Sequence, residues 1–131
     1  MKIALVAIGI ALSSTCIAQT ESDVRARARA CQSSYGTAPP AGATLPKADP
    51  PVRLATVMFE PAFAYACVTV TVDESGKIVD ARVVETDHAP FGEHLLAQAV
   101  ASKWRPAMLD GAPMRFTVVV SGSYGPSGPP Q

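Results

Sequence analysis

The feature that most constrains this chain is a strict two-residue alternation over residues 66–72. Its three valines fall on one face of an extended segment, and the intervening cysteine and threonines fall on the other. Because successive side chains of a strand point to opposite faces, the alternation predicts a half-buried strand. Residues 73–76 have the composition of a tight turn, and residues 77–86 form a second valine-rich segment. Together the segments predict an antiparallel hairpin.

The segment after the hairpin has the spacing of an amphipathic helix, predicted over residues 91–104. Its apolar face consists of residues spaced three and four apart, namely Phe91, Leu95, Leu96, Ala99 and Val100. Pro106 ends this helix, and a turn at residues 110–113 leads into a third strand at residues 114–124. One helix laid across a three-stranded antiparallel sheet buries both apolar faces. The predicted fold class is therefore α+β, with this main helix packed on the sheet.

A short N-terminal helix is predicted over residues 19–35, because alanines favour it and a threonine or serine near its start can cap it. Arg25, Arg27 and Arg29 alternate with the alanines. A spacing of two distributes charges over more than one helix face, so the arginines predict a solvated helix rather than a concentrated basic stripe.

The chain between this helix and the hairpin is rich in proline. Residues 36–51 hold five prolines, which predicts an extended, semi-rigid linker. The sheet domain is then expected at residues 52–124, and whether its first residues, 52–64, form one or two helical turns stays open. Residues 125–131 are rich in glycine and proline and predict a disordered tail.

Residues 1–18 have the three parts of a secretory signal peptide. Lys2 is the basic region, residues 3–12 are apolar or small, and residues 13–18 are small or polar. The apolar run is about ten residues long, whereas a helix that spans a bilayer needs about 20. Cleavage after Ala18, and hence export, is therefore predicted. Two alternatives stay open: attachment of a lipid to Cys16 after cleavage in front of it, and an uncleaved anchor.

Two cysteines, Cys31 and Cys67, remain if Cys16 leaves with the signal peptide. Unpaired thiols are unusual in an oxidising compartment, so a Cys31–Cys67 disulfide is expected. Across such a span, a bridge stabilises the fold by about 3–4 kcal/mol in the chain-entropy model. The alternative is that Cys67 is a buried strand residue and Cys31 is a free thiol.

The sequence contains no pattern typical of catalysis or of metal binding. His88 and His94 are the only histidines, and no further His or Cys lies at ligand spacing from them. The serines lack the context of an activated nucleophile, and no two carboxylates are marked as an acid/base pair. The formal net charge is zero, which gives no general attraction to nucleic acid. We expect no catalytic residue, metal, cofactor, nucleic-acid partner or small-molecule substrate.

Several segments occur in the order and spacing of a known domain. They are the strand ending in Val72-Asp73, the turn Glu74-Ser75-Gly76-Lys77, the strand Ile78-Val79-Asp80-Ala81-Arg82-Val83-Val84, the helical Ala97-Gln98-Ala99-Val100, then Trp104-Arg105-Pro106-Ala107, Gly111-Ala112-Pro113-Met114 and the closing valine-rich strand. This set resembles the C-terminal domain of TonB, the energy-transducing protein of Gram-negative bacteria. The chain departs from the family where a Tyr-Pro and a Glu-Gly precede the first strand. Trp104 also stands where the family has Phe, and Ser102 where it has Trp.

The resemblance implies a periplasmic module that binds protein. Members of the family bind a short segment of outer-membrane receptors by adding it as a strand to the edge of their sheet. Transferred to this chain, the docking edge is the closing strand, with residues Phe116, Thr117, Val118, Val119, Val120 and Ser121. The implied partner is an extended segment of an envelope protein, such as a TonB-dependent outer-membrane receptor. Membrane contact is expected only if Cys16 carries a lipid.

A second interpretation keeps the fold but not the docking. The chain would then be a structural or accessory domain of the envelope, without receptor binding or energy coupling. Two sequence features argue against force transmission in either case. The N-terminal apolar segment is predicted to be removed, and the predicted linker has only 16 residues, from 36 to 51.

Overall fold

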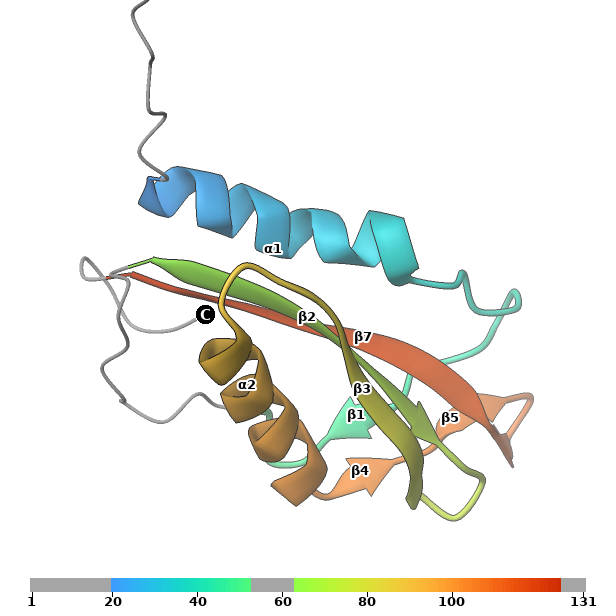
Figure 1. Cartoon of the computed structure of the whole chain (residues 1–131). Helices are drawn as coiled ribbons and strands as arrows, with labels where there is room; N and C mark the ends of the chain where they lie inside the picture. Colours follow the sequence, from blue (N-terminus) through green and yellow to red (C-terminus); the bar gives the residue numbers. More distant parts are fainter. Residues whose placement is uncertain (1–19, 53–62, 126–131) are drawn as a thin grey trace, which may run out of the picture.

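The computed structural model describes residues 20–52 and 63–125 of the chain (Figure 1). In chain order its elements are α1 (Glu21–Tyr35), β1 (Lys47–Ala48), β2 (Ala64–Val72), β3 (Ile78–Thr86), α2 (Ala89–Ala101), β4 (Trp104–Arg105), β5 (Ala107–Leu109), β6 (Ala112–Met114) and β7 (Phe116–Tyr124). Strands β2, β3 and β7 form one antiparallel sheet with β2 in the centre, in the order β3-β2-β7. The predicted α+β fold, with a helix on a three-stranded sheet, is confirmed.

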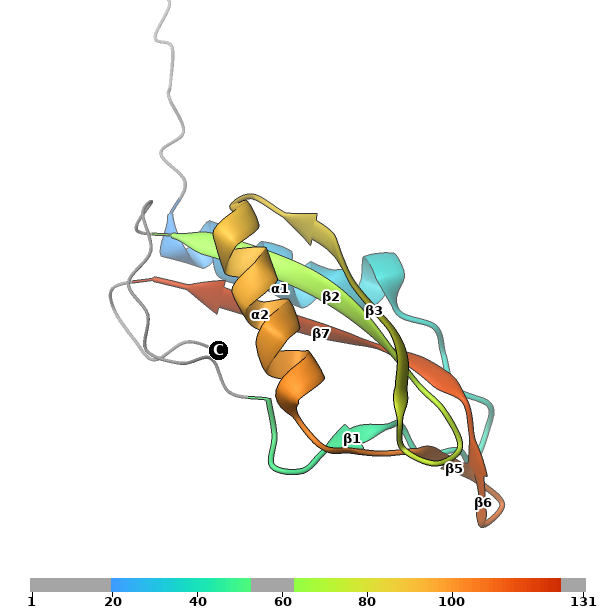
Figure 2. The same cartoon turned by 60° about the horizontal axis from the view of Figure 1, so that its bottom comes forward.

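Helix α2 lies across one face of the sheet and closes the main core (Figures 1 and 2). Phe91, Leu95 and Ala99 of α2 are buried against the even-numbered residues of β2. Those β2 residues are Ala64, Ala66, Val68, Val70 and Val72, all of which are fully buried. Burying a valine, leucine or phenylalanine side chain contributes about 1.5–3 kcal/mol, so this layer supplies much of the driving force for folding.

Helix α1 covers the opposite face of the sheet, which makes three layers rather than two (Figure 1). Val24, Ala28 and Cys31 of α1 pack on Tyr65 and Cys67 of β2. As a result, β2 is buried on both faces from Ala64 to Val68 and keeps the predicted half-buried pattern only beyond that point. The expectation of one half-buried face is therefore wrong for the first half of β2, because α1 covers the second face.

The start of α1 agrees with its prediction. Thr20 is the N-cap, where its hydroxyl accepts a hydrogen bond from the backbone N–H of Asp23 at 3.3 Å. The Asp23 carboxylate in turn accepts one from the backbone N–H of Thr20 at 3.2 Å, so two donors at the helix start are satisfied.

The predicted main helix differs from α2 at both ends. It begins at Ala89 and ends at Ala101, three residues earlier than expected. Trp104 instead lies in strand β4, and its indole N–H donates to the carbonyl of Ala99 at 2.9 Å. Val100, expected on the apolar face, is 50% exposed, because α2 presents Leu95 and Ala99 to the sheet.

The proline-rich segment 36–51 is attached to the rest of the fold rather than being a free spacer. Its β1 pairs antiparallel with β4 (Figure 1). Thr44 forms a bridge with Met108. Ala48 and Pro46 are buried, although most of the segment is exposed. The segment thus follows the surface and returns the chain from α1 to the end of α2. This attachment was missed because a pair of two-residue strands leaves no periodic signal.

The backbone conformations of two turns are explained by their sequences. In the hairpin between β2 and β3, the Asp73 carboxylate accepts hydrogen bonds from the Ser75 hydroxyl and from the backbone N–H of Ser75 and Lys77. The bond from the Ser75 hydroxyl, followed by that from Lys77, lowers the pKa of Asp73 below its ordinary value. Gly76 has a φ of 86°, and a Cβ there would lie 2.7 Å from the carbonyl oxygen of Trp104. Glycine is therefore required at this turn.

The second turn joins β5 to β6. Asp110 and Gly111 both have positive φ, at 51° and 79°. This is the backbone of a two-residue hairpin turn, for which Asp-Gly is a preferred sequence. The turn was predicted, but the three-residue strands on either side of it were not.

Three predictions fall on residues that the structure does not describe. They are the signal peptide with Cys16, the helical turns between residues 53 and 62, and the tail beyond residue 125. Neither α1 nor α2, the two helices of the described ranges, is long and apolar enough to cross a membrane.

Candidate strand-docking edge

The predicted docking residues lie in β7, at one edge of the sheet. Phe116 to Ser121 pair with β2, in a regular antiparallel register from Val72–Phe116 to Cys67–Ser121. No strand of the described residues pairs with the other side of β7. The outward backbone groups of an edge strand are available to a further strand.

The side chains of β7 are less buried than those of its neighbour β2. Val118, Val119 and Val120 are all partly exposed, whereas Val68 and Val70 in the centre of the sheet have no exposed surface. Val118 and Val120 pack at the margin of the α2 core, and Val119 packs at the margin of the α1 cluster. An additional strand beside β7 would extend both apolar layers and bury the remaining surface of these valines.

Strand β3, at the other edge, carries features that oppose strand addition. It has an ion pair between Arg82 and Asp80, with a nitrogen–oxygen distance of 2.9 Å. Its register with β2 shifts twice, which leaves Val79 and Val84 without a cross-strand partner. Charges and bulges are the usual protection of an edge strand. In contrast, β7 has neither, because its sequence FTVVVSGSY contains no charged residue and its register is unbroken.

Helix α1 lies along β7 and leaves a hollow at the C-terminal end of that strand. The hollow has a volume of about 190 Å³. It is lined by Arg25, Ala28 and Arg29 of α1 and by Ser121, Gly122 and Ser123 of β7. Sequence reasoning missed this hollow because it depended on where α1 packs. The helical spacing of Val24, Ala28 and Cys31 was the sequence pattern that could have predicted how α1 packs.

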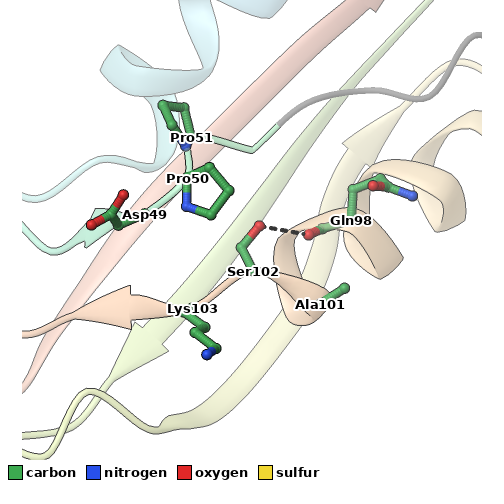
Figure 3. Close-up of a pocket in the computed structure, with 7 residues that line it drawn as sticks. All are labelled: Asp49, Pro50, Pro51, Gln98, Ala101, Ser102 and Lys103. Carbon is green, nitrogen blue, oxygen red and sulfur yellow. Dashed lines mark hydrogen bonds between the residues drawn. The ribbon is translucent and has the colours of Figure 1, made fainter.

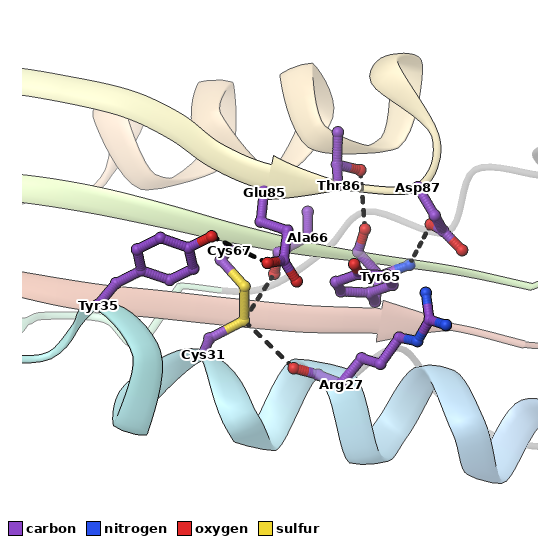
Figure 4. Close-up of a disulfide and its surroundings, with 9 residues drawn as sticks. All are labelled: Arg27, Cys31, Tyr35, Tyr65, Ala66, Cys67, Glu85, Thr86 and Asp87. Carbon is purple, nitrogen blue, oxygen red and sulfur yellow. Dashed lines mark hydrogen bonds between the residues drawn. A yellow bond between two sulfur atoms is a disulfide. The ribbon is translucent and has the colours of Figure 1, made fainter.

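The predicted disulfide joins α1 to the sheet (Figure 4). Cys31 and Cys67 are bonded, with their Cα atoms 5.7 Å apart, and both side chains are buried. Two polar contacts flank the bridge on the β3 side of α1. The guanidinium of Arg27 lies 5.6 Å from the centre of the Tyr65 ring, and the Tyr35 hydroxyl donates to Glu85 at 2.9 Å. This hydrogen bond to Glu85 is the main cause that raises the pKa of Tyr35.

The start of β2 is also held by side chains from the end of β3. The Asp87 carboxylate accepts from the backbone N–H of Tyr65 at 2.9 Å, and the Thr86 hydroxyl donates to the carbonyl of Tyr65 at 2.8 Å (Figure 4). The Asp87 carboxylate therefore holds the start of β2, although Asp87 directly precedes His88, the N-cap of α2. The sheet is therefore fastened at the end where the disulfide lies.

A larger hollow, of about 580 Å³, is open to solvent at the C-terminal end of α2 (Figure 3). Its walls combine residues 49–51 of the proline-rich segment with Gln98, Ala101, Ser102 and Lys103. The Ser102 hydroxyl donates to the carbonyl of Gln98, and the Asp49 carboxylate pairs with Arg105. Because no histidine is among the lining residues, Ser102 has no imidazole base there. Over residues 20–52 and 63–125, no three His, Cys, Asp or Glu side chains gather as a possible metal site.

We compared the chain with known proteins. No protein-family model, curated protein or solved structure matches the chain at a significant level.

Proposed function

We propose that this protein is a periplasmic, TonB-like binding module that takes an extended segment of an envelope protein as a fourth strand beside β7. One observation carries the proposal: β7 is an uncharged, regularly paired edge strand, whereas β3 carries charges and two register shifts. Edge strands without such protection readily pair with another chain. The ordered resemblance to the TonB C-terminal domain and the buried Cys31–Cys67 bridge support the same proposal.

The partner that best fits this edge is an extended stretch of protein with alternating apolar side chains. Main-chain hydrogen bonds to β7 would supply affinity, and the partly exposed valines at positions 118–120 would select apolar side chains. Periplasmic segments of outer-membrane transport proteins are the candidates that the resemblance offers.

We expect saturable binding when the oxidised mature protein is tested against synthetic peptides that tile the periplasmic N-terminal segments of outer-membrane receptors. The readout is fluorescence anisotropy of the labelled peptides. Each peptide has a matched version with N-methylated backbone at alternate residues, which cannot form the ladder hydrogen bonds. Strand addition predicts that methylation on the paired side abolishes binding. Absence of saturable binding by every peptide would favour the accessory envelope domain instead.

A further inference from the structure

The flank of α1 beside β7 carries two arginines. Arg25 and Arg29 are four residues apart and therefore lie on the same side of the helix. Arg27 lies on the opposite flank, over the ring of Tyr65. The alternating arginines of the sequence are thus divided, and two of the three line the hollow at Ser121–Ser123 together with Ala28.

These two arginines differ in their existing partners. Arg25 is partly buried and pairs with Glu21 at 2.8 Å. Arg29 is exposed and makes no ion pair with any residue of the described ranges 20–52 and 63–125. The adjoining β7 contributes no acidic side chain. The two arginines that line the hollow, taken with the glutamate that pairs with Arg25, therefore carry a net formal charge of +1.

The position of α1 determines which side chains of an added strand would meet this charge. Val119 belongs to the α1 side of the sheet, and Ser121 and Ser123 share its face because they follow at intervals of two. A fourth strand would lie about 4.8 Å beyond β7, with every second side chain on this same face. The side chain next to Ser121 or Ser123 would then lie beside Arg25 and Arg29.

We infer that the segment docked on β7 carries an aspartate or glutamate at the position beside Ser121–Ser123, where Arg25 and Arg29 bind its carboxylate. This inference rests on the proposed strand addition. A peptide fits the hollow better than an anionic lipid does, because one wall of the hollow is the edge strand itself, with its outward backbone groups. A helix that binds an anionic membrane would turn all three arginines toward the lipid, whereas Arg27 lies on the other flank of α1.

The test uses the disulfide-bonded mature protein and a probe peptide of about twelve residues, enough to span β7 at about 3.3 Å per residue. The probe alternates valine and threonine and has one glutamate, with glutamine and lysine versions as its matched set. At low ionic strength we expect the glutamate probe to bind about three- to tenfold more tightly than the glutamine probe. Raising the salt concentration shrinks this preference. Arg29→Gln reduces the preference, and Arg29→Glu makes the lysine probe the strongest binder.

Arg27→Gln is the matched control, since it removes an exposed arginine from the same helix on the other flank. It leaves the glutamate preference unchanged. Probes that bind with equal affinity, and Arg29 variants that leave this equality intact, overturn the inference while strand addition stands. If N-methylated and unmethylated probes bind alike, or none binds, the proposed function fails as well. Binding of phosphatidylglycerol vesicles that needs Arg27 as much as Arg29, without glutamate-dependent peptide binding, assigns the charge to a membrane and also overturns the inference.

Discussion

Breaking the Cys31–Cys67 bridge is expected to lower the free energy of unfolding by about 4 kcal/mol. The two cysteines are separated by 36 positions, and closing a loop of this length in the unfolded chain corresponds to about 4 kcal/mol in the chain-entropy model. The effect is large for this fold because Val24 and Ala28 are the two residues of α1 that are buried against the sheet besides Cys31. The measurement is urea unfolding of the oxidised protein, of the reduced protein, and of the double variant Cys31→Ala with Cys67→Ala.

Reduction and the double variant should shift the unfolding midpoint in the same direction. A local readout separates loss of α1 packing from general weakening, since trypsin can cleave after the arginines of α1 once that helix detaches. We therefore expect cleavage at Arg25, Arg27 or Arg29 to accelerate more than cleavage at Arg82 in β3. Equal unfolding midpoints for oxidised and reduced protein would show that the bridge does not stabilise this fold.

The second large effect is expected from proline in β7. Proline has no backbone N–H, and successive N–H groups of a strand point to opposite edges. Of the variants Val119→Pro and Val120→Pro, one therefore removes a bond to β2 and the other removes a donor from the outer edge. The outer-edge variant should stay folded by circular dichroism and bind the probe at least about tenfold more weakly, because a ladder bond is lost and the ring obstructs pairing.

The matched control is the same pair of substitutions in β3, Arg82→Pro and Val83→Pro. These positions lie at the other edge of the sheet, so the folded member of the pair should bind the probe as the wild type does. If a folded proline variant of β7 binds normally while a folded β3 variant does not, the docking edge is β3. The contrast keeps the test informative even though one variant of each pair is destabilised.

The main sheet and α2 were predictable because their signals are local. The two-residue alternation of β2, the turn at Asp73–Gly76 and the spacing of Phe91, Leu95 and Ala99 each belong to one segment. The packing of α1 on the second face of the sheet was harder to predict, because α1 has only three buried residues, at positions 24, 28 and 31. These three positions have helical spacing. The residues between them are mostly alanines and arginines, however, so the same segment is also compatible with a solvated helix.

The residues of the proposed docking strand predicted a strand, but its place at an edge was expected only from the family resemblance. Which strand lies at the edge depends on the order β3-β2-β7, and that order is a property of the whole fold. The grouping of Arg25 and Arg29 beside Ser121 likewise depends on contact between segments almost 100 residues apart. In both cases the sequence contains the residues, and the tertiary packing determines their neighbours.

The measurement that tests strand addition at β7 most directly is amide hydrogen exchange of the protein, followed residue by residue by NMR with and without saturating probe peptide. A strand added beside β7 gives new partners to every second N–H group of residues 116–121, namely those that point away from β2. Strand addition at β7 predicts slower exchange at alternate β7 amides and no change at the amides of β3. Protection that appears in β3, or no protection anywhere at saturation, would contradict it.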